Sequence, residues 1–196
     1  MIITGTKERD SVLVKKITEL QRKVGNTPLL KINPALYNKP GVEIYAKKEW
    51  LQIGGSVKAR AAYSIIKYAI EHGQLTREKV LLDATSGNTG IAYAAIAKEI
   101  GFKVALCLPE NASIERKQIL TDLGVNIIYT SALEGTDGAQ EKAQELAKHH
   151  PEKYFYADQY KNENNWKAHY NTTAFEIIEE VLGITHFATG LGTTGT

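Results

Sequence analysis

The chain has 196 residues, of which 43% are hydrophobic and 23% are charged. This composition is typical of a globular protein and excludes a disordered, collagen-like or coiled-coil chain. Lysine and arginine number 24 against 22 aspartate and glutamate residues, and this net charge of +2 gives no support to a nucleic-acid or polybasic membrane partner.

Segments with helical and strand-like patterns alternate from about residue 56. Apolar residues at helical spacing predict a helix that begins near Val57 and stops at Gly73. The same patterns predict strands over 79–84, 102–108, 125–129, 154–156 and 184–188. They predict further helices over 91–100, 113–123, 135–150 and 164–182.

This alternation is typical of an α/β fold in which a parallel sheet carries helices on both faces. In such sheets, ligands bind at the carboxyl ends of the strands, in the turns that lead into helices. Three turns of this chain carry residues that suit such a site.

The first turn, over 54–60, places Lys58 in the first turn of a helix after two glycines. The positive end of the helix dipole lowers the pKa of a lysine at that position. A lowered amine pKa is what covalent chemistry with an aldehyde requires of a lysine. Taken alone, however, the motif is better explained by a solvated lysine beside a glycine turn.

The second turn, over 85–90, combines two glycines, three hydroxyl groups and an amide ahead of a helix. Free backbone N–H groups and the helix dipole suit such a turn to a carboxylate or a phosphate. The same residue types are also the preferred N-caps of helices, so both interpretations stand at this point.

The third turn, over 190–196, follows the predicted strand 184–188 and is rich in glycine and threonine. Closely spaced glycines let a backbone approach an anion, and threonine hydroxyls add donors. Residues 190–195 also match G-x-G-x-x-G, so a nicotinamide dinucleotide site is the rival interpretation. A lysine, a carboxylate-type site and a phosphate-type site at one sheet edge together fit pyridoxal phosphate holding an amino acid.

Several motifs in order along the chain resemble one enzyme family, the cysteine synthase and cystathionine β-synthase group of fold-type II pyridoxal-phosphate enzymes. These motifs are residues 24–29, 55–58, 85–90, 158–160, 168–173 and 192–196. Residues 115–117, 134–139 and 185–187 are most similar to the cysteine synthase B (O-acetylserine sulfhydrylase) branch.

The resemblance implies two three-layer α/β/α domains with mostly parallel sheets, the second of them incomplete. Residues 1–51 are expected to join the larger cofactor domain, 52–160 to form the smaller domain, and 161–196 to begin the larger one. Chains of this family run well past the 192–196 motif. We therefore expect this chain to be a C-terminally truncated fragment with weak activity or none.

The resemblance also implies roles for matching residues. Lys58 would hold the cofactor and remove the substrate's α-proton, and Asn88 would bond to the cofactor's ring hydroxyl. The cofactor phosphate would be held by Gly192, Thr193, Thr194, Gly195 and Thr196. The substrate carboxylate would be held by Thr85, Ser86, Gly87, Thr89 and Gln159.

The implied reaction is β-replacement on an activated serine, O-acetylserine or O-phosphoserine, by a sulfur nucleophile to make L-cysteine. The alternative within the same chemistry is cystathionine β-synthase, which uses serine and homocysteine. A nicotinamide-dependent oxidoreductase built on the 190–195 turn is a remote alternative. A non-catalytic binding protein is another, because Ala59 stands where the family usually has aspartate.

The remaining sequence features bear on location and partners. The first ten residues have no basic and apolar leader, and no apolar run reaches the ~20 residues that cross a bilayer. We expect a cytoplasmic protein with no membrane partner, a homodimer when full length. The single cysteine, Cys107, is expected in the core, and the histidines lack metal-ligand spacing, so no metal site is predicted.

Overall fold

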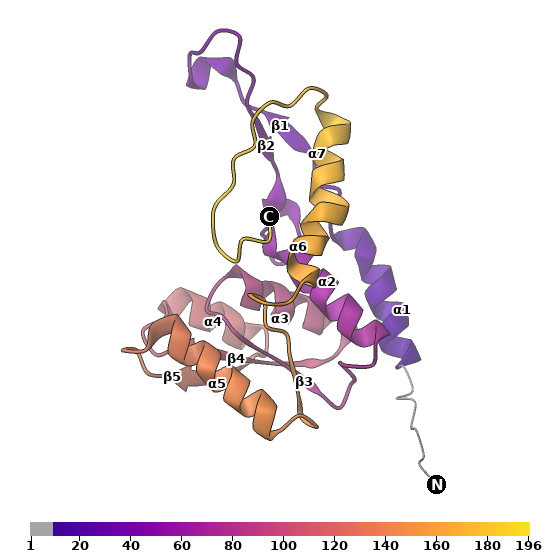
Figure 1. Cartoon of the computed structure of the whole chain (residues 1–196), viewed down its shortest axis with the longest axis vertical. Coiled ribbons are helices and arrows are strands. Elements are labelled where there is room, and N and C mark those ends of the chain that lie inside the picture. The colour runs from indigo at the N-terminus through magenta and orange to yellow at the C-terminus, as the bar shows by residue number, and fades with distance from the viewer. Residues whose placement is uncertain (1–9) are drawn as a thin grey trace.

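The computed structural model describes residues 10–196, and its central element is a four-stranded parallel sheet (Figure 1). The strands lie in the order β5-β4-β3-β6. They comprise β3 (Val80–Ala84), β4 (Lys103–Pro109), β5 (Asn126–Thr130) and β6 (Tyr154–Tyr156). All neighbouring strands of this sheet are parallel, which confirms the four strands predicted before residue 160 and their arrangement.

Helices cover both faces of this sheet, as predicted. Helix α5 (Gly135–His149) packs on one face, and α3 (Asn88–Ile100) and α4 (Ile114–Asp122) pack on the other. Helices α2 (Lys58–Glu71) and α1 (Ser11–Leu20) pack against α3 from outside. Helix α3 begins at Asn88, three residues before the predicted start, so part of the 85–90 motif lies in its first turn.

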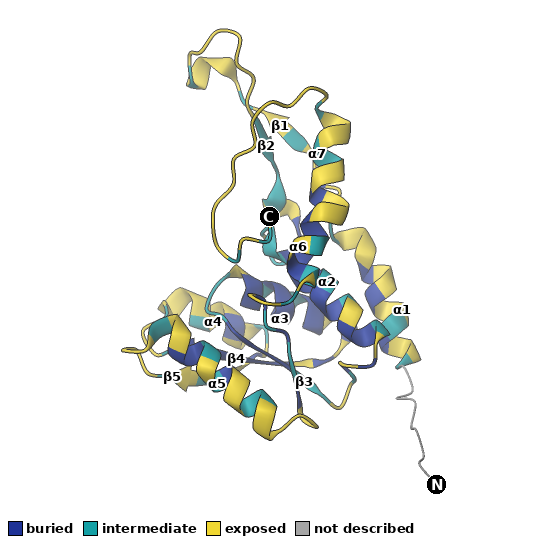
Figure 2. Ribbon diagram, viewed as in Figure 1, coloured by how far each residue is buried: buried dark blue, intermediate teal, exposed yellow. Residues whose placement is uncertain are grey.

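Strand β4 is buried in the centre of the sheet (Figure 2), and the alternation of its side chains divides the core in two. Val104, Leu106 and Leu108 pack with the buried faces of α1, α2 and α3. Ala105 and Cys107 point the other way and pack with α5. Because both faces of the strand are covered, its apolar residues run without a break. Cys107 is 0% exposed, so its predicted place in the core is confirmed.

The chain before α2 contains a second, two-stranded sheet that the sequence patterns did not predict. Strands β1 (Leu29–Lys31) and β2 (Tyr45–Lys47) pair in antiparallel fashion and extend away from the parallel sheet (Figure 1). Short 3₁₀ turns precede, separate and follow these strands, over Gln21–Lys23, Pro34–Leu36 and Glu49–Leu51. Each strand has only three residues, which is too short to give a clear alternation.

The predicted helix over 164–182 is confirmed, with an irregular centre. Helix α6 (Asn164–Ala168) passes through a π-helical turn (His169–Thr173) into α7 (Ala174–Glu180). Such turns are rare and occur frequently at functional sites. Here the turn places His169 and Thr173 in the interior of the molecule.

The predicted strand over 184–188 is wrong. These residues form no strand, and Ile184 and Phe187 are 44% and 59% exposed. A strand exists only where a neighbouring strand takes up its backbone N–H and C=O groups. The described part of the chain supplies no such neighbour, so the apolar alternation remains unpaired.

No helix within residues 10–196 is long and apolar enough to cross a membrane.

Candidate functional site

A cavity of about 270 Å³ lies at the carboxyl ends of β3 and β4, where the fold class predicts a ligand site. Its walls come from the residues that follow the strands and from the starts of α2, α3 and α5. The lining residues are Lys58, Ala84, Thr85, Ser86, Gly87, Asn88, Thr89, Cys107, Pro109, Arg116, Thr136, Ala139, Gln159, Tyr160, Gly192 and Thr193. They include two cationic side chains and no aspartate or glutamate.

Lys58 is the first residue of α2 and projects into this cavity. Burial lowers the pKa of its amine below the usual value. No carboxylate of residues 10–196 lies in ion-pair contact with it; its nitrogen Nζ lies 3.4 Å from Oγ1 of Thr193. The start of α2 confirms the helix start predicted from the sequence. Burial lowers the pKa of the Lys58 amine in addition to the effect expected from the helix dipole.

Residues 85–89 line the wall of this cavity that is formed where β3 turns into α3. Oγ1 of Thr85 accepts a hydrogen bond from the N–H of Gly87 at 3.1 Å, which fixes the turn. The N–H of Gly90 donates to the carbonyl oxygen of Gly87 at 3.1 Å, and the N–H groups of Asn88 and Thr89 precede it at the start of α3, where a helix offers donors to an anion. All five predicted residues of this motif therefore share one cavity with Lys58.

Gln159 reaches the cavity from the chain that follows β6. Its side-chain amide donates to the carbonyl oxygen of Ala84 at 3.2 Å, and its backbone N–H donates to Oδ2 of Asp83 at 3.3 Å. Burial raises the pKa of Asp83 to about 7, although the Ala84 N–H and the Tyr93 hydroxyl bond to its carboxylate. Asp83 and Tyr93 thus support Gln159, a role that no sequence pattern indicated.

The 190–196 segment is divided between two cavities. Gly192 and Thr193 line the cavity of Lys58, whereas Gly195 and Thr196 line a neighbouring one and Thr194 lines neither. Of the five residues predicted to bind a phosphate, the structure therefore brings two to Lys58. The ideal Cβ position of Gly192 lies 3.7 Å from Nζ of Lys58, so the backbone here runs close to the amine.

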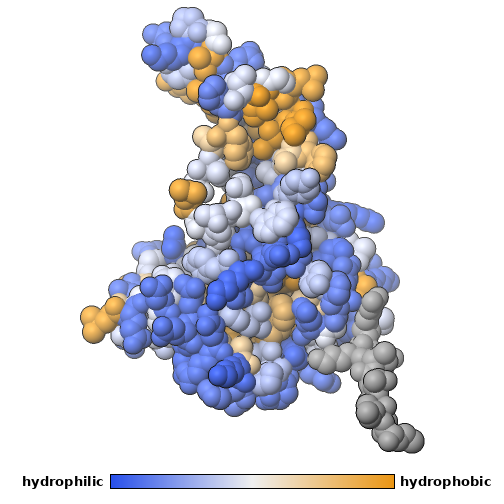
Figure 3. All heavy atoms as spheres, viewed as in Figure 1, coloured by the Kyte–Doolittle hydropathy of each residue, from blue (hydrophilic) through white to orange (hydrophobic). Residues whose placement is uncertain are grey.

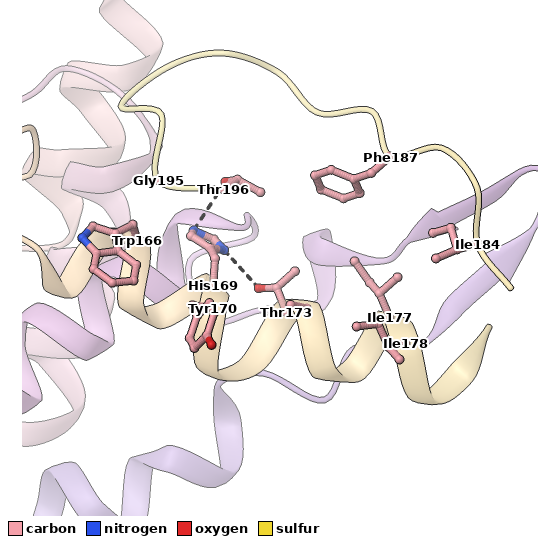
Figure 4. Close-up of a pocket in the computed structure, with 11 residues that line it drawn as sticks. Trp166, His169, Tyr170, Thr173, Ile177, Ile178, Ile184, Phe187, Gly195 and Thr196 are labelled. Atoms are coloured by element: carbon pink, nitrogen blue, oxygen red, sulfur yellow. Dashed lines mark hydrogen bonds between the residues drawn. The ribbon is translucent and has the colours of Figure 1, made fainter. Parts of the chain in front are cut away.

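The neighbouring cavity of about 400 Å³ lies between the α6–α7 helix and the 184–196 segment (Figure 4). Its walls are mostly apolar, and exposed apolar side chains continue over this part of the molecule (Figure 3). His169 stands at its base, with Nδ1 3.0 Å from Oγ1 of Thr173 and Nε2 3.4 Å from Oγ1 of Thr196. Burial, together with the charges of Arg60 and Lys58, lowers the pKa of His169 to about 4.

A buried network of ion pairs around Arg60, in the first turn of α2, was missed by the sequence analysis. Arg60 is 2% exposed and forms ion pairs with Glu49 at 2.8 Å and Glu176 at 2.6 Å. Lys47 adds a further ion pair to Glu176 at 2.9 Å. An arginine two residues after Lys58 was a visible signal, but its partners lie 11 and 116 residues away and no local pattern connects them.

Comparison with known proteins identifies the family. A family model described as "Pyridoxal-phosphate dependent enzyme" matches residues 20–196. The chain belongs to the pyridoxal-phosphate dependent enzyme family. The predicted resemblance and its cofactor class are confirmed, and the nicotinamide interpretation of the 190–195 turn is left without support.

Individual relatives show which enzymes of this family the chain is similar to. The chain is 45% identical over 192 residues to "Cysteine synthase" of Aquifex aeolicus, covering 96% of this chain and 59% of that protein. It is 40% identical over 181 residues to "Cysteine synthase B" of Escherichia coli, covering 92% and 59%. The structure matches the O-acetylserine dependent cystathionine β-synthase of Helicobacter pylori with a TM-score of 0.81 and 38% identity, covering 90% and 58%.

These solved neighbours are fold-type II enzymes, which confirms the predicted fold class. The chain spans 59% of the length of the two curated relatives.

Proposed function

We propose that the full protein makes L-cysteine from an activated serine and a sulfur nucleophile, with pyridoxal phosphate bound at Lys58. One observation carries the proposal: a partly buried amine that pairs with no carboxylate of residues 10–196 shares a cavity with the α3 N-terminus and with Gly192 and Thr193. The relatives named cysteine synthase support the reaction. The absence of acidic side chains from the lining residues fits a ligand that carries both a phosphate and a carboxylate.

Pyridoxal phosphate supplies an aldehyde that an amine can attack and an electron sink for charge developing at the substrate's α-carbon. In the proposal, Lys58 holds this aldehyde at its Nζ and, when released, takes the proton from the α-carbon. Its lowered pKa favours the neutral amine that both tasks require.

The substrate carboxylate is proposed to bind at the start of α3. Thr85, Ser86 and Thr89 supply hydroxyls there, and the backbone of Gly87 lies in the same turn. Gln159, held in place by β3, is proposed to add a donor. Together these groups would orient the α-carbon toward Lys58.

The cofactor's ring and phosphate are proposed to lie between Asn88 and the 192–196 segment. Gly192 and Thr193 already line the cavity. Phosphate binding by Thr194, Gly195 and Thr196 is proposed from the family motif alone.

We also propose the domain division 1–51, 52–160 and 161–196, a homodimeric full-length protein and a cytoplasmic location.

A trapping experiment tests the cofactor site directly. The chain is mixed with pyridoxal phosphate, reduced with borohydride, digested and analysed by mass spectrometry for the lysine that carries the pyridoxyl group. We expect one adduct, on Lys58, that is lost in Lys58→Ala and kept in Lys67→Ala, a change on the same helix. A chain that unfolds cooperatively yet shows no selective adduct would overturn the proposal.

Cystathionine synthesis is the second candidate, because one structural neighbour is named as an O-acetylserine dependent cystathionine β-synthase. The full-length protein would be assayed with O-acetylserine and sulfide, and separately with serine and homocysteine. The proposal expects faster turnover of the first pair. Preference for the second pair would replace it with cystathionine synthesis.

A further inference from the structure

The side chain of Asn165 lies between the two segments that close the Lys58 cavity. Asn165 is on α6 and is 4% exposed. Its Nδ2 lies 2.7 Å from the carbonyl oxygen of Gln159 and 2.8 Å from Oγ1 of Thr193. A carbonyl oxygen can only accept, so the atom facing it must be the amide nitrogen. The orientation of the amide is thereby determined.

Thr193 continues the chain of hydrogen bonds to the reactive amine. Its Oγ1 accepts from Asn165 on one side and from Nζ of Lys58, at 3.4 Å, on the other. A hydroxyl oxygen has two acceptor lone pairs, and these two donors occupy both. The Thr193 hydroxyl is therefore held in one orientation, with its oxygen directed at Lys58.

The other end of the Asn165 amide is unusual. Oδ1 is buried and has no hydrogen-bond partner among residues 10–196, which is rare for buried polar atoms. An ideal Cβ at Gly195 would lie 2.2 Å from this oxygen, so any larger residue at this position must displace the Asn165 amide. The hydrogen bonds of the Asn165 amide are therefore those that its nitrogen makes to Gln159 and Thr193.

We propose that Asn165 is a positioning residue that holds the Thr193 hydroxyl against Lys58 and joins the segment of Thr193 to that of Gln159. The proposal rests on the proposed function in taking Lys58 as the reacting amine. Asn165 itself does not line the Lys58 cavity and acts through Thr193. It therefore sets the position and protonation of the amine without contacting a ligand.

The test measures Lys58 in the chain without cofactor. Lysines are acylated with a trace of acetic anhydride across a pH range, and mass spectrometry gives the labelling midpoint of Lys58 relative to exposed Lys15. Losing an acceptor disfavours the charged amine, so Thr193→Val and Asn165→Ala should each lower this midpoint by about 0.5 pH unit. At a pH below the midpoint, Lys58 should then be labelled about threefold faster in either variant than in the wild type.

A double-mutant cycle separates positioning from general structural support. Because Asn165 acts through Thr193, adding Asn165→Ala to Thr193→Val should cause no further shift. The matched control is Asn164→Ala, on the same helix, whose side chain bonds to Asn162; it should leave Lys58 unchanged. An unchanged midpoint in Asn165→Ala, or strictly additive shifts, would overturn the proposal.

Gly195→Ala provides a second route should Asn165→Ala fail to unfold cooperatively. The added methyl group displaces the Asn165 amide without altering it, so the same shift is expected, again absent in the Thr193→Val background. A normal Lys58 midpoint in Gly195→Ala would count against the proposal. Since no cofactor is present, these results are independent of the trapping experiment that tests the proposed function.

Discussion

The guanidinium group of Arg60 lies 2.6 Å from the carboxylate of Glu176, a residue 116 positions further along the chain. Arg60 stands in the first turn of α2, two residues after Lys58, and Glu176 stands on α7. Burial acts to raise the pKa of Glu176, but hydrogen bonds from Arg60, Lys47 and the Asn26 N–H outweigh it and lower the pKa to about 2. This ion pair therefore fixes the helix turn that carries Lys58.

Breaking this pair should destabilise the chain strongly. Glu176→Ala leaves the buried charge of Arg60 only partly compensated, so we expect a loss of about 3 kcal/mol in the free energy of unfolding. Urea denaturation measures this loss. The control is Glu145→Ala, which breaks the exposed ion pair to Lys142 and should leave stability nearly unchanged, because water and salt screen such pairs. Equal losses in the two variants would contradict the assigned role.

His169 should make stability depend on pH. Its pKa is about 4 in the folded chain against the ordinary histidine value of 6.5, so the unfolded chain binds more protons between these values. Stability should therefore fall as the pH is lowered from 6.5 toward 4, by at most about 3 kcal/mol for this group. In His169→Gln the free energy of unfolding should fall less steeply over the same pH range. Urea midpoints between pH 4.5 and 6.5 test this, with exposed His186→Gln as the control.

Ser86 should contribute to binding of the substrate carboxylate. Removing one hydroxyl donor from a charged acceptor costs about 1.5 kcal/mol, or about tenfold in affinity. We expect this weakening in Ser86→Ala when the cofactor-loaded chain is titrated with O-acetylserine and followed by absorbance. Ser131→Ala, in an exposed turn far along the chain, should bind as the wild type does. Equal affinities in all three proteins would remove Ser86 from the site.

Cys107 should be unreactive in the folded chain. It is fully buried in β4, and burial raises the pKa of its thiol to about 11. The thiolate is the reactive form, so a thiol reagent such as dithionitrobenzoate should modify the native chain slowly and the urea-unfolded chain rapidly. Cys107→Ser gives the background rate. Rapid modification under native conditions would contradict this burial of the thiol.

The regular part of the fold was predictable because its signals are local. Apolar runs bounded by glycine and proline predict the parallel strands, and Gly101 ends α3 in the left-handed conformation (φ 88°) expected of a glycine C-cap. The strand over 184–188 was predicted wrongly because its apolar alternation is local, whereas strand formation depends on a partner strand from elsewhere in the chain.

The candidate site also contains residues with a local sequence signal and residues without one. Lys58 and the 85–90 turn carry their chemistry in consecutive residues, so spacing alone pointed to them. Asp83, Tyr93, Arg60 and Asn165 support these residues through contacts between distant segments. Their partners lie in other segments of the chain, so no local pattern in the sequence indicated these contacts.

The sequence by itself determined the order of helices and strands over residues 57–182, the turns that carry reactive groups and, through several motifs together, the family. Only the tertiary structure decided which of those groups meet. It placed Gly192 and Thr193 beside Lys58 but Gly195 and Thr196 beside His169. Periodicity and capping act within a few residues, whereas ion pairs, buried hydrogen bonds and cavities join residues that are neighbours only after folding.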